Sequence, residues 1–380
     1  MRNLGWPLQR LRRSDDSGVI GVLVAVLIGG GVLLGTGALV IDVGQIYQNR
    51  AELQNGADAG ALAVARQCAL GSCASAGAMS TALTYANSNA SALTQHTAGV
   101  MAVCGSDGLG NCSAVVGTGL TNCPADPTNG VNYVDVLTST KLANGSTLLP
   151  PVFGQTLAGS STYDGTNVKA CAQAEWGPPS SADTIAYTVS ACSWYAYTNN
   201  GAMFAEPPPY PPDSAPTSSD DHILYEHGSP NATTGGCPED NASGADAPGN
   251  FGWTTDSGNC SVYISSSGTY GGSTGASASR DCQTAIYNDW LNKTVVYLPI
   301  YTTVTGPGSG ATYTLLGFAA FVITGYHITG SFHQNDWLNS ANNCKGNKFC
   351  IDGYFTHGLI PSIGDPGGTP LGANVVKLTG

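Results

Sequence analysis

An uncharged apolar run near the N-terminus constrains this chain more than any other feature. The run from Gly18 to Ile41 is 24 residues long and reads GVIGVLVAVLIGGGVLLGTGALVI. A helix of this length extends for about 36 Å, whereas the hydrocarbon core of a bilayer is roughly 30 Å thick. The sequence therefore predicts a transmembrane helix over 18–41 that crosses the membrane once.

The charges on either side of the run indicate its orientation. Positive residues accumulate on the cytoplasmic side of a span, so we expect residues 1–17 in the cytoplasm and the C-terminal part outside the cell membrane. A cleaved signal peptide is the alternative, but the run exceeds the usual apolar length of about 7 to 15 residues, and no A-x-A site follows directly after it. The flanking charges are Arg2, Arg10, Arg12 and Arg13 before the run and Asp42 after it.

Helical spacing continues beyond the run. Small or apolar side chains and one arginine recur at alternating intervals of four and three residues, which predicts one helix that extends outside the membrane over 42–66. The GxxxG pairs Gly31/Gly35 and Gly56/Gly60 allow close packing with other helices, including copies of this chain. The triplet at 29–31 can instead kink the span. The spaced positions are Leu39, Val43, Ile46, Arg50, Leu53, Ala57, Gly60 and Val64.

The residues of this helix carry a family resemblance. D-V-G follows the apolar run, with an aromatic residue three positions on, then an arginine, L-Q-N and A-D-x-x-A-L-A. Residues 17–65 thereby resemble the N-terminal domain of TadE/TadG-like proteins of Flp (tight adherence) pilus assembly. Ala78 to Ala90 resembles the short second helix of that family, so we expect a short helical region over 67–99. The matching residues are Asp42, Val43, Gly44, Tyr47, Arg50, Leu53, Gln54, Asn55, Ala57, Asp58, Ala61, Leu62 and Ala63.

The resemblance implies a structural or assembly component of a pilus or a related secretion apparatus. Its partners would be other pilus-assembly or pilin-like membrane proteins. The sequence departs from the family in two respects. Gly18 is not followed by the glutamate that processed pilins carry at the fifth mature position, and the D-x-S-x-S metal motif of many TadG-like members is missing. The sequence therefore supports neither pilin-like processing nor metal-dependent adhesion of that kind.

After the helix, short β-branched and aromatic stretches alternate with Gly, Pro, Asn and Ser clusters, which is typical of strands and turns. We expect an α+β protein whose exported domain, 100–380, is an antiparallel β-rich unit with a loop-rich insertion at 199–281. Thr294–Val304 and Ala311–Ile328 predict a hairpin bulged at Gly317. The end of this region, through Ile351–Phe355, also resembles longer TadE/TadG-like ectodomains. Further predicted strands are Asn132–Ser139, Thr166–Trp176 and Thr184–Cys192.

The chain contains 12 cysteines, which fits an oxidising compartment. Cys68 with Cys73, and Cys344 with Cys350, enclose loops short enough for local disulfides. The pairing of the others stays open. Zinc binding is the alternative, but the sequence has no CxxC pair and the spacings are wide.

Candidates for other chemistry are weak. Only 10% of the residues are charged and the net charge is −12, which argues against nucleic-acid binding. His222, Glu226 and His227 approach an H-x-x-E-H metal motif but have one residue too many. His327 and His333 are expected as structural or surface residues. Asp126–Gly130 and Asp256–Asn259 are expected to form turns rather than calcium loops. We therefore predict no enzyme activity, no cofactor and no metal site.

The sequence leaves three hypotheses for function. The first is a membrane-anchored scaffold of the TadE/TadG-like type that exposes a disulfide-stapled β-domain outside the cell. The second is an anchored adhesin whose polar loops bind glycans or cell wall. The third and weakest is an anchored hydrolase, which requires His222, His227 or His327 to meet an acid and a nucleophile.

Overall fold

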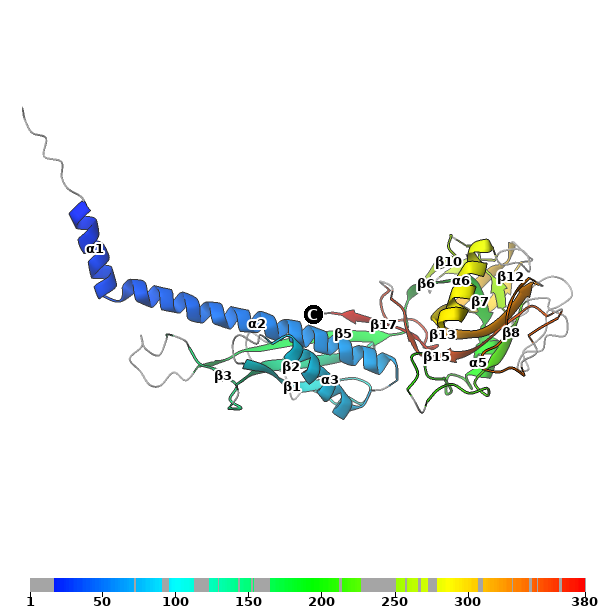
Figure 1. Ribbon diagram of the computed structural model, residues 1–380, viewed down its shortest axis with the longest axis horizontal. Helices are drawn as coiled ribbons and strands as arrows, with labels where there is room; N and C mark the ends of the chain where they lie inside the picture. The colour runs from blue at the N-terminus through cyan, green and yellow to red at the C-terminus, as the bar shows by residue number, and fades with distance from the viewer. Residues whose placement is uncertain are drawn as a thin grey trace, which may run out of the picture.

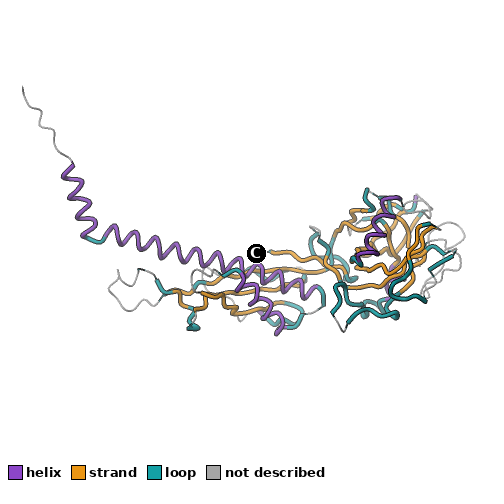
Figure 2. Tube along the Cα trace, in the orientation of Figure 1, coloured by secondary structure: helices purple, strands orange, loops and turns teal. Residues whose placement is uncertain are grey.

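The computed structural model of the protein is elongated, with two β-rich units and a helical arm at one end (Figure 1). Figure 2 shows that the helices are concentrated at the arm end, whereas the far unit consists mostly of strands and loops. The structure describes residues 17–71, 73–90, 96–112, 123–128, 130–142, 144–151, 153, 165–211, 214–226, 251–256, 258–265, 268–272, 279–306, 310–329, 331–341, 344–346, 348–361 and 364–379. The predicted cytoplasmic arginines lie outside these residues.

Two helices form the arm: the helix that the spacing predicts over 42–66 lies unbroken within the second of them, whereas the predicted 18–41 span is interrupted at the glycine triplet. Helix α1 covers Ser17–Gly29, and α2 covers Val32–Ala69. Between them, Gly31 adopts a left-handed φ of 71°, which a residue with a Cβ rarely adopts. The glycine triplet therefore breaks the helix, and α1 projects at an angle from α2 (Figure 1). Among the described residues, no single helix, α1 and α2 included, is both long enough and apolar enough to cross a membrane.

The first β-rich unit is a five-stranded sheet covered by α2 and by α3, Ser75–Ser88. The strand order is β1-β2-β5-β17-β16, so the C-terminal strand pairs with β5 far from its neighbours in sequence. One face of the sheet buries Val134, Val136, Ala172 and Trp176 against α2. The strands are β1 (His96–Gly105), β2 (Asn132–Leu142), β5 (Lys169–Gly177), β16 (Gly358–Leu359) and β17 (Ala373–Leu378).

The second unit is built around an eight-stranded sheet. Its main path is β8-β15-β13-β12-β7-β9, and β11 and β14 also pair with β13. The strands are β7 (Tyr187–Ser190), β8 (His222–Tyr225), β9 (Phe251–Trp253), β11 (Thr269–Gly271), β12 (Val295–Thr305), β13 (Thr312–Thr329), β14 (Phe332–Gln334) and β15 (Cys350–Thr356).

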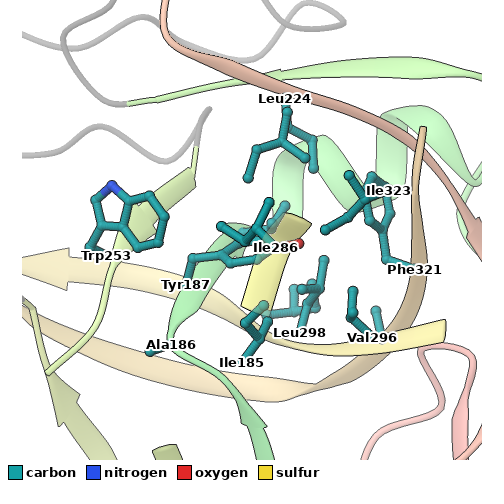
Figure 3. Close-up of a cluster of buried hydrophobic side chains, with 14 of the residues drawn as sticks. Ile185, Ala186, Tyr187, Leu224, Trp253, Ile286, Val296, Leu298, Phe321 and Ile323 are labelled. Atoms are coloured by element: carbon teal, nitrogen blue, oxygen red, sulfur yellow. The ribbon is translucent and has the colours of Figure 1, made fainter. Parts of the chain in front are cut away.

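Shorter elements complete the fold. Helix α5 (Ala191–Tyr197) follows β7, and α6 (Arg280–Asn292) packs on the second sheet through Ile286. Figure 3 shows Ile286 among the side chains of Leu298, Phe321 and Ile323, in a core where all four are fully buried. The remaining strands form two small sheets, β10 (Ser261–Ser265) with β6 (Ser181–Ile185) and β3 (Leu148–Leu149) with β4 (Thr166–Asn167).

The α+β prediction is confirmed, with helices first and β-rich sheets after them. The predicted hairpin is β12 with β13, whose register shifts at Ile300/Tyr301, next to Gly317. The single strand predicted over Thr184–Cys192 is wrong, because β6 ends at Ile185, β7 ends at Ser190 and α5 begins at Ala191. The predicted strand over Thr166–Trp176 is likewise divided into β4 and β5. The described part of segment 199–281 contributes β8 to β11.

Candidate assembly interface

The predicted helical seam divides into an exposed half and a buried half. Exposure of its side chains falls from 62% at Leu39 to 4% at Leu53, and Ala57 and Val64 are fully buried. The N-terminal half therefore presents apolar side chains to the surroundings, whereas the C-terminal half packs within the chain. In α1 the exposed apolar residues are Val19, Ile20, Val22, Leu23, Val24, Val26 and Ile28, and in α2 they are Val32, Leu39, Val40, Ile41, Val43 and Tyr47.

The two GxxxG pairs have different surroundings. A Cβ on Gly56 would lie 3.0 Å from Ala86 Cα, and one on Gly60 would lie 3.4 Å from Ala82 Cα. The close helix packing predicted from this pair is therefore present, and the helix that it seats is α3 of the same chain. By contrast, Gly35 has nothing within 4 Å of the position a Cβ would take.

Polar residues of the motif connect α2 to the first sheet. Gln54 Nε2 donates to Asp58 Oδ1 at 2.8 Å and to the carbonyl oxygen of Cys171 on β5 at 3.0 Å. Thr138 Oγ1 on β2 donates to the carbonyl oxygen of Leu53 at 3.0 Å. Asp58, whose purpose is not evident from the sequence, thus accepts a hydrogen bond from the side chain that joins helix to sheet.

The other motif residues lie nearer the exposed half. The amide of Phe153 donates to Asp42 Oδ1 at 3.1 Å. Gly44 has open space around it, and Tyr47 is 70% exposed. Arg50 is half-buried and Asn55 is exposed, whereas Ala61 is fully buried beside Ala57. The motif therefore combines residues that fasten α2 to its own sheet with residues that face outward.

Five disulfides join described residues. Cys68–Cys73 closes the turn after α2, and Cys344–Cys350 closes the loop before β15. In addition, Asn374 Nδ2 on β17 donates to the carbonyl oxygen of Ala69 at 2.8 Å, so the end of α2 is also fixed to the sheet. The remaining three are Cys104–Cys112, Cys123–Cys171 and Cys260–Cys282.

The histidines considered for hydrolysis occupy separate structural positions. His222 lies on strand β8, not on a helix, and its ring stacks on Tyr197 with centroids 4.2 Å apart. His327 lies on β13, where Nδ1 hydrogen-bonds the carbonyl oxygen of Lys348 at 2.7 Å. Glu226 accepts a hydrogen bond from Trp253 Nε1 at 2.8 Å. His227 lies outside the described residues.

A cluster of three carboxyl groups has no signal in the sequence. Asp221, Asp336 and Asp352 place carboxylate oxygens within 4.8 Å of one another. Burial, reinforced by the charge of Asp336, raises the pKa of Asp352 to about 8 and that of Asp221 to about 9, although Thr324 Oγ1 donates to Asp221 at 2.6 Å. The carboxyl oxygens of these three aspartates are ligands of the kind that Ca²⁺ or Mg²⁺ takes.

Comparisons with known proteins identify the helical arm. Residues 18–67 match the family described as Flp pilus-assembly TadE/G-like. No curated protein and no solved structure matches the chain. The match covers α1 and nearly all of α2, the elements that carry both the exposed apolar side chains and the hydrogen bonds to the first sheet. The N-terminal helical segment of this chain is therefore a TadE/G-like domain of Flp pilus assembly.

Proposed function

We propose that the chain is a non-enzymatic envelope component of a Flp pilus-assembly apparatus. Residues 18–41 anchor it in the membrane, with the N-terminus in the cytoplasm and the two β-rich units outside. The observation that carries this proposal is the exposed apolar surface of α1 and the first turns of α2. No charged residue interrupts this surface before Asp42. An apolar surface of this extent favours burial in lipid or against other helices.

The buried half of α2 supports a scaffold role. Because α2 runs without a break from Val32 to Ala69, the α2 part of the anchoring surface and the sheet-binding surface belong to one helix, and α1 continues the anchoring surface beyond the break at Gly31. Hydrogen bonds from Gln54, Thr138 and Asn374 hold that helix to the first sheet. The first β-rich unit is therefore fastened to the same helix that carries the membrane-proximal part of the anchor, which suits a component that positions partners outside a membrane. The disulfides are consistent with an oxidising location outside the cytoplasm.

Photo-crosslinking from two positions of α2 tests this proposal. A photoreactive residue at Val40, which is 71% exposed, should crosslink to lipid or to another pilus-assembly protein in intact cells. The same residue at Ala61, which is fully buried, provides the matched control, and any crosslink from it should stay within the chain. Crosslinks to other proteins from Ala61 but none from Val40 would contradict the proposed arrangement.

Membrane fractionation tests the anchor separately. Leu23 and Leu39 are exposed apolar side chains within the 18–41 segment. Replacing them by arginine introduces charges into that segment, at a cost of about 2.5 to 3.5 kcal/mol each at the centre of a span. We expect the Leu23→Arg/Leu39→Arg variant to leave the membrane fraction, whereas a variant with Asn55→Arg at an exposed polar position should stay there. An anchor elsewhere in the chain is indicated if the double variant stays in the membrane.

A further inference from the structure

A cleft in the second unit has no part in the proposed anchoring. It encloses about 430 Å³ between the end of α5, the loop that follows it, and the segment leading into β8. This volume falls within the range of roughly 300 to 1,000 Å³ that small-molecule sites occupy. Three segments that are distant in sequence contribute its walls, namely residues 196–205, residues 219–222 and Phe355.

Both walls of the cleft are held by hydrogen bonds. On one side, the amide of Met203 donates to the carbonyl oxygen of Thr198 at 2.8 Å, and the amide of Ala205 donates to that of Phe355 at 3.1 Å. On the other side, the amide and hydroxyl of Thr217 donate to Asp220 Oδ2 at 2.7 and 2.8 Å. The cleft is therefore a preformed feature of the fold rather than a gap between loosely attached loops.

The turn after α5 places an asparagine at the cleft in an uncommon backbone conformation. Asn199 and Asn200 have φ values of 49° and 59°, a left-handed region that residues other than glycine seldom adopt. Only Asn199 lines the cleft. Its side-chain amide makes no hydrogen bond with any residue that the structure describes, so both its donors and its acceptor are available to a ligand.

The charges of the lining restrict the ligand. Among the residues that the structure describes, no lysine or arginine lines the cleft, and Asp220 contributes a carboxylate. Burial lowers the pKa of His222, although Asp220 and a hydrogen bond with the Tyr197 backbone oppose this shift. A phosphate, sulfate or carboxylate would find no cation to pair with it here. The cleft therefore disfavours anionic ligands.

The remaining surfaces alternate between polar and apolar groups. Asn199, Ser219, Asp220 and His222 offer hydrogen-bonding groups, whereas Tyr197 and Phe204 contribute aromatic surface. A sugar ring matches such a lining, because its hydroxyl groups form hydrogen bonds and its C–H faces pack on apolar and aromatic side chains. We propose that this cleft binds an uncharged carbohydrate of one or two sugar units, with Asn199 donating to and accepting from its hydroxyl groups.

Saturation-transfer NMR on the purified full chain, kept in amphipol, tests this inference. The probes are chitobiose, maltose and lactose as neutral sugars, with choline as a cationic probe. We expect saturation transfer to at least one of the sugars. Asn199→Gly keeps the backbone conformation but removes the amide, and it should weaken sugar binding by about threefold to tenfold. Asn200→Gly is the matched control, because it makes the same change beside the cleft, and it should bind like the original protein.

A second variant fills the cleft without removing a hydrogen bond. Ala202 is exposed and lines the cleft, so Ala202→Trp should abolish sugar binding while the circular dichroism spectrum stays unchanged. The inference is overturned if none of the sugars receives saturation, if choline alone does, or if Asn199→Gly and Asn200→Gly bind equally well. None of these outcomes bears on the anchor, which is tested by fractionation and crosslinking.

Discussion

The close contact between α2 and α3 predicts how much each glycine of α2 tolerates replacement by alanine. Three glycines of α2 differ in the space around them. A Cβ on Gly56 would lie 3.0 Å from the backbone of Ala86, and one on Gly60 would lie 3.4 Å from the backbone of Ala82. A Cβ on Gly44 would have no neighbour within 4 Å. Glycine to alanine in a helix gains about 1 kcal/mol from backbone entropy. At Gly56 this gain is opposed by overpacking, which costs about 1 to 3 kcal/mol.

The expected order of stability follows from these opposing effects. Gly56→Ala should lower the free energy of local unfolding by about 1 kcal/mol, whereas Gly60→Ala should leave it equal or raise it by up to about 1 kcal/mol. Gly44→Ala should cause no loss. Hydrogen exchange with mass spectrometry, read on peptides from α2, α3 and β5, measures each change locally. If Gly56→Ala is as stable as Gly60→Ala, α3 does not rest on this face of α2 and the packing argument fails.

Two further predictions concern polar groups. Asp58→Ala should lower the free energy of unfolding by about 1 kcal/mol, because Gln54, which joins α2 to β5, loses the acceptor that orients it. The control Asn55→Ala, at an exposed position, should change that free energy by less than about 0.5 kcal/mol. Equal losses for the two variants in urea unfolding would refute this. Because the pKa of Asp352 is raised from 3.8 to about 8, the folded state retains a proton that the unfolded state loses, and stability should fall across that pH window. Asp352→Asn should flatten the fall in urea titrations from pH 4 to 9, and an unchanged slope would show that Asp352 is not the titrating group.

Local features of the chain were predictable because they depend on neighbours in sequence. The helix of α2 follows from the four-and-three spacing, and the break between α1 and α2 follows from the conformational freedom of three consecutive glycines. The α+β class and the β12–β13 hairpin follow from residue composition and a short connection. The TadE/G-like domain was recognisable because its motif is contiguous over residues 18–67.

Sites built from distant segments were not predictable in this way. Asp221, Asp336 and Asp352 are dispersed along the chain, and only the pairing of β8, β13 and β15 brings their segments together. Likewise, the cleft at Asn199 depends on the approach of residues 219–222 and Phe355. Neither arrangement has a sequence spacing that could indicate it, because spacing reports only contacts within one helix or one strand.

Helix α2 illustrates both what the sequence determines and what depends on the tertiary structure. By itself, the sequence determined that α2 has a seam of small and apolar residues and that two GxxxG pairs permit close approach of another backbone. Only the tertiary structure decided that Ala82 and Ala86 of the same chain occupy the second pair, whereas Gly35 of the first pair stays open. The physical reason is that a helix face specifies how closely a neighbour can pack, but the folded path of the chain specifies which neighbour arrives there.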